Sequence, residues 1–224
     1  KACKIQITEQ DEVYGKTVIQ RHGAVMLVQN PPMPPLTTEE LDAVYKLPFM
    51  RAVHPCYDKD GGVPAITEVE FSITHNRGCY GACNFCSLAF HQGRFITSRS
   101  KESVVEEAKL LTTLPGFKGY IHDIGGPTAN FRRPACDIQL DKGLCKGKKC
   151  LAPKPCPNLI ANHEEYLDIL REIRNLPKVK KVFIRSGLRF DYILEDKNDE
   201  FFKELKDLIG VQQNEKHHAE GDVW

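Results

Sequence analysis

The sequence has almost no excess of charge of either sign, because its 31 Lys and Arg residues balance 30 Asp and Glu residues. The resulting formal net charge of +1 gives no overall field that would attract nucleic acid or a membrane surface. The sequence also lacks any apolar run near the roughly 20 residues that span a bilayer, and no apolar signal segment opens it. We therefore expect a soluble, cytoplasmic protein with no membrane partner.

Cysteine, by contrast, is abundant, with nine residues in a chain of 224. A reducing compartment disfavours structural disulfides, so clustered cysteines there indicate metal or redox chemistry. The first cysteine set comprises Cys79, Cys83 and Cys86, and the second cysteine set comprises Cys136, Cys145, Cys150 and Cys156. Cys3 and Cys56 stand apart from both sets, and we interpret them as ordinary small apolar residues.

Residues 1–64 are predicted to form a β-rich appendage that precedes the main domain. Residues 4–8 alternate polar and apolar side chains, which predicts a strand. Residues 17–19 and 24–28 are rich in β-branched and apolar residues and flank His22-Gly23, a pattern typical of a hairpin. Because the first residue is Lys rather than Met, we expect the chain to be a piece of a longer protein.

A proline-rich segment, residues 30–35, follows the predicted hairpin. It has too few N–H donors for a sheet and predicts a stiff extended linker. Thr37 and Glu40 then have the spacing of a capping box, which predicts a helix from there to about Lys46. Pro48 is placed to stop that helix.

Residues 65–210 are predicted to form the main domain, because strand and helix patterns alternate there three times. The predicted strands cover residues 67–74, 119–124 and 179–184, and the predicted helices begin at Ser100, Asn162 and Asn198, the last running to about Ile209 before Gly210. Repeated strand–helix units predict parallel strands joined by right-handed crossovers, as in part of a (β/α) barrel. Three units cannot close a barrel, so the alternatives are an incomplete barrel and a small open sheet.

Residues 127–161 form a Cys-rich insertion between the second strand and the second helix, with little periodic pattern. A stretch of this length needs a source of order, and four thiolates could bind structural zinc or an auxiliary iron–sulfur cluster. Nearby lysines would offset the charge of such a centre or form a basic patch for an anionic partner: Lys142, Lys146, Lys148, Lys149 and Lys154. No aromatic residues interleave with them, so stacking on nucleic acid is not supported.

Two features of this part of the chain stay open. The second cysteine set could equally be four free thiols in a mobile loop. The polar tail, residues 211–224, receives no function.

The first cysteine set lies on a loop that directly follows the first predicted strand of the main domain, where active sites of barrel folds are built. Thiolates suit zinc or iron–sulfur centres, and three ligands would leave one metal position open. The alternative is a zinc knot, but structural zinc takes four ligands. Only Cys83 and Cys86 have the usual close spacing, with His75 or His91 as the remaining candidates.

The pattern Cys-x3-Cys-x2-Cys, with Phe85 before the last cysteine, resembles the signature of radical S-adenosylmethionine (SAM) enzymes. With the proline-rich segment and the Cys-rich insertion, the chain resembles YgiQ-type radical SAM proteins over residues 1–210. The resemblance implies an α/β fold, a partial (β/α) barrel of the radical SAM type.

The resemblance also implies the cofactors. The first cysteine set would hold three irons of a [4Fe–4S] cluster, and the fourth iron would chelate the amino and carboxylate groups of SAM. One electron from a donor partner would split the sulfonium, giving methionine and a 5′-deoxyadenosyl radical that abstracts hydrogen from a substrate. Phe85 would lie beside the adenine.

Gly125 and Gly126 match the segment that, in this family, receives the SAM amino group through backbone carbonyls. Pro127 stands where the family has an acidic residue, so that side-chain contact is absent. Arg185 and Arg189 end the third predicted strand and could bind a carboxylate or phosphate, or serve a structural role. His75 and His122 near strand ends are interpreted as structural.

Two other classes of protein compete with a radical SAM enzyme. One is a non-catalytic zinc-binding interaction module that uses up to seven of the cysteines; metal content separates it from the enzyme. The other, a ferredoxin-like electron carrier, is less favoured because carriers normally saturate all iron sites with four cysteines. Substrate residues in such barrels come from later strands, so we expect this chain alone to be incomplete for activity.

Overall fold

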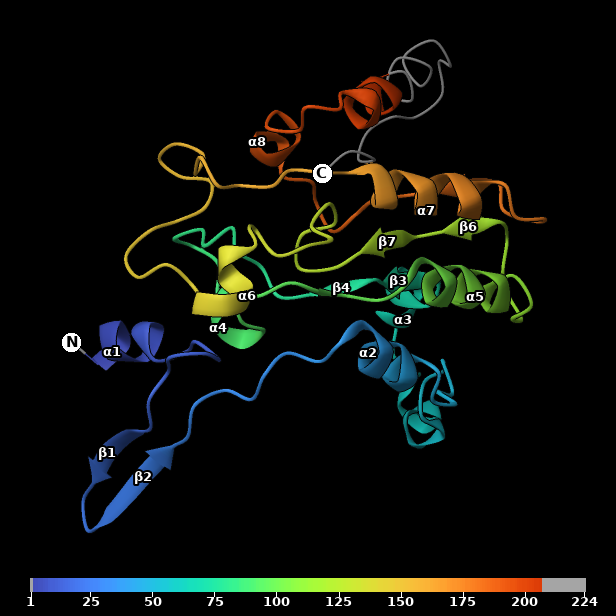
Figure 1. Cartoon of the computed structure of the whole chain (residues 1–224). Coiled ribbons are helices and arrows are strands. Elements are labelled where there is room, and N and C mark those ends of the chain that lie inside the picture. Colours follow the sequence, from blue (N-terminus) through green and yellow to red (C-terminus); the bar gives the residue numbers. More distant parts are fainter. Residues whose placement is uncertain (1, 207–224) are drawn as a thin grey trace.

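The computed structural model describes residues 2–206, which form a mixed α/β structure with four two-stranded pairings (Figure 1). Two pairings are antiparallel and two are parallel. None of the helices in this range is long and apolar enough to cross a membrane.

The first segment of the appendage is a helix, so the predicted strand over residues 4–8 is wrong. Helix α1 spans Ala2–Thr8. A strand needs a neighbouring strand to accept and donate its backbone hydrogen bonds, whereas a helix forms these bonds within itself. Within α1, Thr8 Oγ1 also donates to the Lys4 carbonyl at 2.9 Å. The hairpin is confirmed: β1 (Val18–His22) pairs antiparallel with β2 (Val25–Gln29) around Gly23, whose φ is +58°.

The linker and the capped helix are as expected. Residues 30–36 have no regular structure. Helix α2 spans Thr38–Tyr45, and Thr37 and Glu40 form the complete capping box. A short 3-10 helix, η1 (Pro55–Asp60), follows.

Residues 65–206 contain three parallel extended stretches, which lie side by side in the order β3, then β6 with β7, then β8. Strands β6 and β7 are parts of one stretch, separated by a single residue. The strand bounds are β3 Ser72–Thr74, β6 Tyr120–Ile121, β7 Asp123–Gly125 and β8 Lys181–Val182. Strand β3 pairs parallel with β7, and β6 pairs parallel with β8. The parallel pairing is as predicted, and residues 2–206 contain no closed barrel.

The first half of the predicted strand over residues 67–74 is wrong, because it is helical. Helix α3 spans Ile66–Val69, directly after Pro64. The Thr67 hydroxyl donates to the Pro64 carbonyl at 2.9 Å, and Val69 is exposed, so no sheet partner supports an extended chain there.

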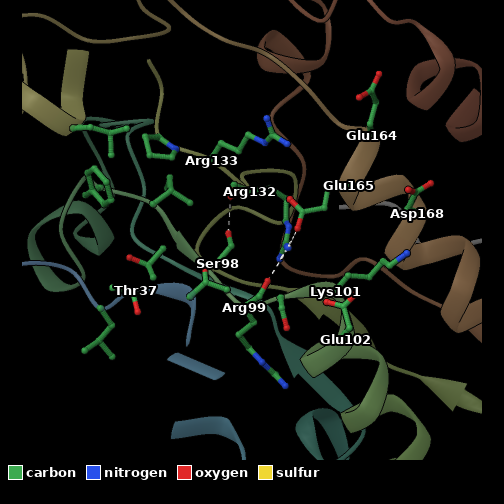
Figure 2. Close-up of a pocket in the computed structure, with 18 residues that line it drawn as sticks. Thr37, Ser98, Arg99, Lys101, Glu102, Arg132, Arg133, Glu164, Glu165 and Asp168 are labelled. Atoms are coloured by element: carbon green, nitrogen blue, oxygen red, sulfur yellow. Dashed lines mark hydrogen bonds and ion pairs between the residues drawn. The ribbon is translucent and has the colours of Figure 1, made fainter. Parts of the chain in front are cut away.

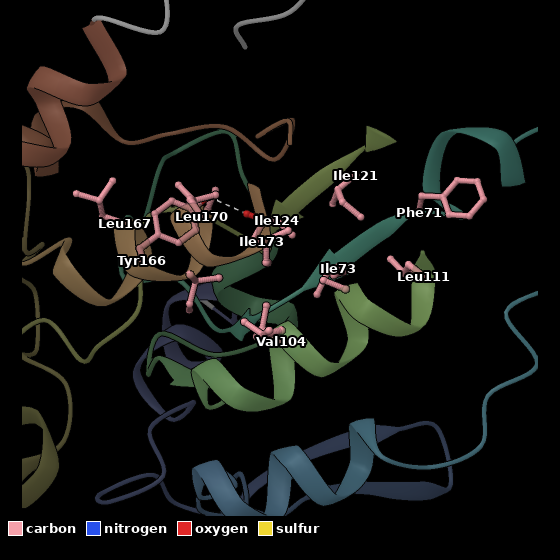
Figure 3. Packing of buried hydrophobic residues seen from close by; sticks show 14 of the residues in the cluster. Phe71, Ile73, Val104, Leu111, Ile121, Ile124, Tyr166, Leu167, Leu170 and Ile173 are labelled. Atoms are coloured by element: carbon pink, nitrogen blue, oxygen red, sulfur yellow. Dashed lines mark hydrogen bonds between the residues drawn. The ribbon is translucent and has the colours of Figure 1, made fainter. Parts of the chain in front are cut away.

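Two long helices cover the sheet and enclose the main core (Figure 3). Helix α5 (Lys101–Leu111) begins at Ser100, whose hydroxyl accepts the Ser103 N–H, as predicted. Helix α7 (Glu164–Arg174) carries the predicted apolar stripe. The fully buried residues contributed by sheet and helices include Ile73, Ile121, Ile124, Val104, Ala108, Leu111, Tyr166, Ile169 and Ile173. Burial of each large side chain contributes about 1.5–3 kcal/mol.

The third predicted helix is partly within the described residues. Residues 200–206 are helical, and residues 207–210 lie outside the described range. A separate short helix, α8 (Phe190–Ile193), precedes it.

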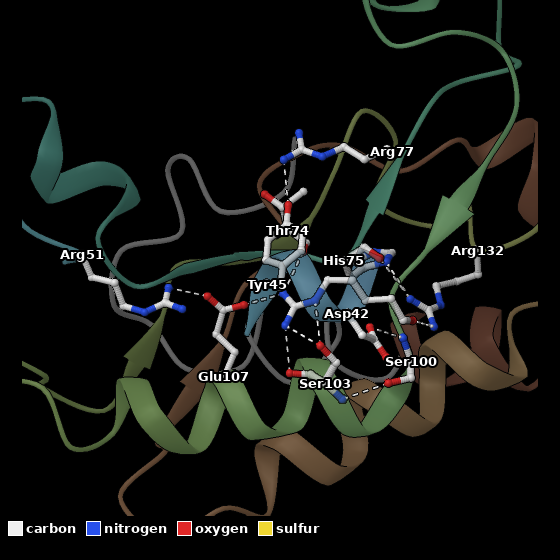
Figure 4. Close-up of polar contacts among 11 residues, drawn as sticks. Asp42, Tyr45, Arg51, Thr74, His75, Arg77, Ser100, Ser103, Glu107 and Arg132 are labelled. Carbon is white, nitrogen blue, oxygen red and sulfur yellow. Dashed lines mark hydrogen bonds and ion pairs between the residues drawn. The ribbon is translucent and has the colours of Figure 1, made fainter. Parts of the chain in front are cut away.

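The segment around Tyr45 packs on β3 and α5 through a buried arginine, Arg99. The partners of this arginine, Tyr45, Thr74 and Glu107, are labelled in Figure 4. The Arg99 guanidinium is ion-paired with Glu107 and donates to the Thr74 carbonyl at 3.1 Å. From the appendage, the Tyr45 ring lies 4.0 Å from the Arg99 guanidinium carbon, and Arg51 shares Glu107. A charge paired and hydrogen-bonded in this way can be buried.

The Cys-rich insertion contains one described helix, α6 (Ile138–Lys142), and is otherwise irregular. The loop of the first cysteine set is instead closed by a short ladder. Strand β4 (Asn76–Arg77) pairs antiparallel with β5 (Thr97–Ser98), and helix α4 (Leu88–His91) lies between them in sequence.

Candidate functional site

The loop of the first cysteine set leaves the carboxyl end of β3 through β4. Gly78 has φ of +81°, and a Cβ there would lie 1.8 Å from the Phe95 carbonyl oxygen, so only glycine fits. The Cys79 N–H donates to the Gly93 carbonyl at 3.0 Å. The backbone therefore holds both ends of the loop together.

The three thiols of this loop have different surroundings. Cys79 is buried, and its Sγ lies 3.3 Å from the Thr128 hydroxyl. Cys83 is half-buried, and its Sγ accepts a hydrogen bond from Arg189 Nη1 at 3.0 Å. Cys86 is half-buried, and its N–H donates to the Cys83 carbonyl at 3.2 Å.

Arg189 is held in place as a fixed cation beside these thiols. Asp191 accepts from Nε at 2.8 Å and from Nη2 at 2.5 Å, a paired geometry that restricts the guanidinium. The hydrogen bonds that Arg189 donates to Asp191 raise the pKa of Arg189, and the nearby Cys83 and Cys79 sulfurs add to the rise. Buried Asn130 binds the Arg189 backbone through both its amide oxygen, at 2.8 Å, and its amide nitrogen, at 3.2 Å.

Gly125 and Gly126 lie where the chain leaves β7, and the structure brings them next to the cysteine loop. A Cβ on Gly126 would lie 1.6 Å from Asn76 Oδ1, and one on Gly125 would lie 1.9 Å from Ser186 Oγ. The Gly126 N–H donates to that hydroxyl at 3.2 Å. The two glycines are thus required by close approach of neighbouring groups. The buried Asn76 Oδ1 has no hydrogen-bond partner.

His75 has the structural role expected for it. Its Nε2 donates to the Ala129 carbonyl at 2.8 Å, and its Nδ1 accepts from Arg132 at 3.1 Å. Burial, and next the Arg132 charge, lower the pKa of His75 to about 3. The imidazole is therefore neutral at physiological pH and ties the end of β3 to the segment that follows the glycine pair.

Phe85 lies on the same loop and is 92% exposed. Its ring is thus accessible to a planar group. Beside the loop is a cavity of about 510 Å³, lined by Cys83 and Cys86 together with Arg94, Lys148 and Lys149. Lys149 Nζ donates to Asn84 Oδ1 at 2.6 Å, so the Cys-rich insertion touches the loop of the first cysteine set.

All four cysteines of the second set line one separate cavity of about 490 Å³. Burial raises the pKa of the Cys150 thiol to about 11. Arg94 opposes the rise, and the other three thiols are near enough to add to it. The structure therefore brings the four thiols around one space, although they span 21 positions of the chain.

Within residues 2–206, no three His, Cys, Asp or Glu side chains are already placed to share a single metal ion. Cysteines that bind different irons of one cluster need not converge on one point. The chemistry of the first cysteine set fits such a cluster: three thiols lie on one glycine-containing loop, and the fixed Arg189 cation offsets thiolate charge.

A charged groove of about 690 Å³ lies elsewhere, between the start of α5 and the start of α7 (Figure 2). Arg132 is buried along it and is ion-paired with Glu165 at 2.5 Å. No cysteine lines this groove. We assign this groove no part in the site.

Several residues around the first cysteine set were not identified from the sequence: Asn76, Thr128, Asn130, Arg132 and Asp191. Each is a single polar residue whose contact partner lies in a distant segment or across a tight turn. No spacing pattern in the sequence predicts such a contact. Arg185, paired in the sequence analysis with Arg189, points to a different partner, since its guanidinium contacts Glu68 at 2.8 Å. His122 stacks edge-on against Phe71 and makes no contact with the cysteines.

Comparison with known proteins identifies relatives of the whole chain. The family described as Radical SAM N-terminal matches residues 1–72. A UPF0313 protein of Clostridium botulinum (strain Okra / Type B1) is 57% identical over 223 residues, covering 100% of this chain and 33% of the relative. A UPF0313 protein of Clostridium perfringens (strain ATCC 13124) is 56% identical over 220 residues, covering 98% of this chain and 32% of the relative.

The chain thus spans about a third of the length of the curated relatives it matches. The matched region of the first relative covers 223 of the 224 residues, and the family match covers residues 1–72. The chain belongs to the UPF0313 family of the radical SAM superfamily.

Proposed function

We propose that this chain carries the SAM-cleaving centre of a radical SAM enzyme, with Cys79, Cys83 and Cys86 as the protein ligands of a [4Fe–4S] cluster. The observation that carries the proposal is the meeting of three strand ends. The cysteine loop follows β3, the glycine pair ends β7, and Arg189 follows β8 and contacts Cys83. Ligand sites of parallel α/β folds form at such strand ends.

The strand order supports the same proposal. Strands β3, β6–β7 and β8 would be the first three strands of a (β/α) barrel, with residues 65–210 as the barrel portion and residues 1–64 as the appendage. The remaining strands, and with them the substrate residues, would come from the rest of a full-length relative.

When bound, the cluster would pass one electron from a donor to SAM, cleaving it to methionine and a 5′-deoxyadenosyl radical that takes hydrogen from a substrate. The protein's own part is positioning. Three thiolates would bind three irons and leave the fourth open for SAM. Arg189 would donate to the Cys83 sulfur and offset negative charge, which favours the reduced state.

The other loop residues would form the SAM site. Gly125 and Gly126 lack side chains where Ser186 and Asn76 approach closely, so their backbone carbonyls are accessible at close range to an ammonium group. The Gly125 carbonyl already accepts the His75 N–H at 2.9 Å and would use its second lone pair. The unpartnered Asn76 Oδ1 is a further acceptor at this place. Phe85 would pack its exposed ring on the adenine.

The test is anaerobic reconstitution of the chain with iron and sulfide, followed by iron analysis and electron paramagnetic resonance with and without SAM. We expect a reduced-cluster signal that SAM changes, and its loss in Cys79→Ala, Cys83→Ala and Cys86→Ala. Cys56→Ser is the matched control, because Cys56 is an exposed thiol outside both sets. If all three alanine variants kept iron and the SAM response, the ligand assignment would be wrong. Zinc without iron at this loop would instead support the interaction module.

A further inference from the structure

The Cys-rich insertion is held in a defined path with very little regular structure. Near its second end, the Ile160 N–H donates back to the Ala135 carbonyl at 2.8 Å. The Ala135 N–H in turn donates to Gln139 Oε1 at 2.9 Å. Leu144 is fixed from outside the insertion, because its N–H donates to the buried carboxylate of Asp11 at 2.6 Å.

These contacts place the second cysteine set around the cavity of about 490 Å³. The Cys156 N–H donates to the Cys150 carbonyl at 2.9 Å, so these two residues are neighbours in space. Cys136 lies at the start of the turn that leads into α6, and Cys145 directly follows the anchored Leu144. These contacts hold the chain around the cavity that all four cysteines line.

Among the side chains that most often bind metals, only cysteines line this cavity. No Asp, Glu or His residue lines it, whereas Lys148, Lys149 and Lys154 do. Thiolates select zinc and iron–sulfur centres and disfavour calcium or magnesium, which require oxygen ligands. The lysines would offset the negative charge that four thiolates carry when they bind a metal.

We propose that Cys136, Cys145, Cys150 and Cys156 form a second, four-thiolate metal centre that orders the Cys-rich insertion. The sulfur atoms are not yet placed to share one ion within the described residues, so binding draws them inward. A metal that gathers four thiols supplies order that a segment with one five-residue helix lacks. With all four positions saturated by protein, the centre has a structural role.

The centre would also support one wall of the candidate active site. Lys148 and Lys149 line both the second-set cavity and the cavity beside Cys83 and Cys86. Arg94 Nη2 donates to the Lys148 carbonyl at 3.3 Å, which fixes this shared wall. The proposal goes beyond the SAM-cleaving function and uses different ligands.

The test uses the 224-residue chain with Cys79, Cys83 and Cys86 all changed to alanine, so that the first cysteine set cannot hold metal. After purification and desalting, metal and sulfide are counted. About one zinc per chain would identify a zinc centre. About four irons with equal sulfide would identify a cluster. Either result supports the proposal, while a folded chain without bound metal, whose second-set thiols all react at once with a thiol reagent, overturns it.

A second measurement tests the metal site directly, so that the proposal does not depend on metal retained during purification. The metal-free triple variant is titrated with Co²⁺, which gives a thiolate charge-transfer band when bound by cysteines. We expect a saturating band that weakens by about a quarter when Cys145, the exposed member, is also changed to serine. Cys56→Ser should leave the band unchanged. An absent band, or one equally strong after Cys136, Cys150 and Cys156 are replaced by serine, contradicts the proposal.

Because the triple variant cannot carry the SAM-cleaving centre, the two proposals fail independently. Loss of the SAM-dependent signal in the native chain says nothing against the second centre, and an empty second cysteine set says nothing against the first.

Discussion

The two cysteine sets occupy loops that the protein supports in opposite ways. The first lies on a loop closed by the β4–β5 ladder and braced by buried side chains, with the cation of Arg189 beside two thiols. The second lies in a segment with one five-residue helix, and its thiols surround a cavity bordered by lysines. The number of thiols differs as well, three against four.

Under the two proposals above, this difference would separate a reactive site from a structural one. A site that must bind and release SAM needs an open metal position, and the surrounding fold must then hold the loop without a fourth protein ligand. A site that saturates its metal can use the metal itself as the support. The loop with fewer protein ligands is therefore expected to depend more on the surrounding fold, and the loop with four ligands to depend more on its metal. This contrast can be tested.

The largest effect expected is the response of the two loops to metal removal. If a metal orders the Cys-rich insertion as proposed, stripping the chain with EDTA and ferricyanide should raise amide hydrogen exchange at Cys156 and Ile160 by tenfold or more, because their hydrogen bonds lie in that insertion. The Cys79 and Arg99 amides, held by the Gly93 and His75 carbonyls, should keep their protection. Equal loss of protection in both loops would break the comparison.

The brace of the first loop should also be visible in the pH dependence of stability. Folded His75 stays neutral to about pH 3, whereas the unfolded chain binds a proton on this residue near pH 6.5. The unfolded state thus binds more protons in this window, so the free energy of unfolding falls by about 1.4 kcal/mol per pH unit as pH drops below 6.5.

His75→Gln keeps a donor for the Ala129 carbonyl and removes this titration. We expect its urea-unfolding free energy to fall less steeply than that of the native chain between pH 6.5 and 5. His163, whose pKa burial also lowers, contributes a slope that both chains share. His22→Gln, at an exposed hairpin position, is the control and should retain the native slope. If the free energy of unfolding had the same pH dependence in the native chain and in His75→Gln, a buried neutral His75 would not contribute to the stability of this loop.

The sequence predicts the parts of this fold that local signals specify. Thr37 with Glu40, Ser100 before α5 and Gly23 between two apolar runs each determine their neighbours' conformation within a few residues. The same is true of the first cysteine set, since its spacing on one loop is itself the signal. The apolar stripe of α7 needs only the helical repeat.

What sequence could not predict depends on distant partners. Residues 4–8 and 66–69 alternate or favour strands, yet both are helical because no neighbouring strand is there to pair with them. The contacts of Arg189 with Cys83, and of Asp11 with Leu144, join residues 106 and 133 positions apart. Polar residues give no periodic pattern, so such pairs are found only in the folded chain.

The charge beside the first cysteine set gives a smaller, more specific test. Arg189→Gln removes a cation and a charged donor from the Cys83 sulfur, which should make reduction of the bound cluster harder. We expect a fall in reduction potential on the order of 60 mV, equivalent to about 1.4 kcal/mol for one electron. Potentiometry followed by electron paramagnetic resonance measures it.

Arg185→Gln is the matched control for this shift. Its guanidinium is half exposed and pairs with Glu68, so the same loss of charge should leave the potential nearly unchanged. If both variants shifted the reduction potential equally, the effect would come from overall charge, and the hydrogen bond from Arg189 to Cys83 would not be its cause.

The smallest effect expected concerns Phe85, the residue on the braced loop that the fold leaves most exposed. Its ring makes no internal packing to lose, so Phe85→Ala should leave stability and iron content unchanged. If the ring packs on adenine, SAM affinity should fall about fivefold, the lower end of what aromatic stacking on a base contributes. Equilibrium dialysis with the reconstituted chain measures the affinity. The control is Phe49→Ala, because Phe49 is a half-exposed phenylalanine outside the cysteine loop. Unchanged affinity in Phe85→Ala would mean that the exposed ring faces something other than SAM.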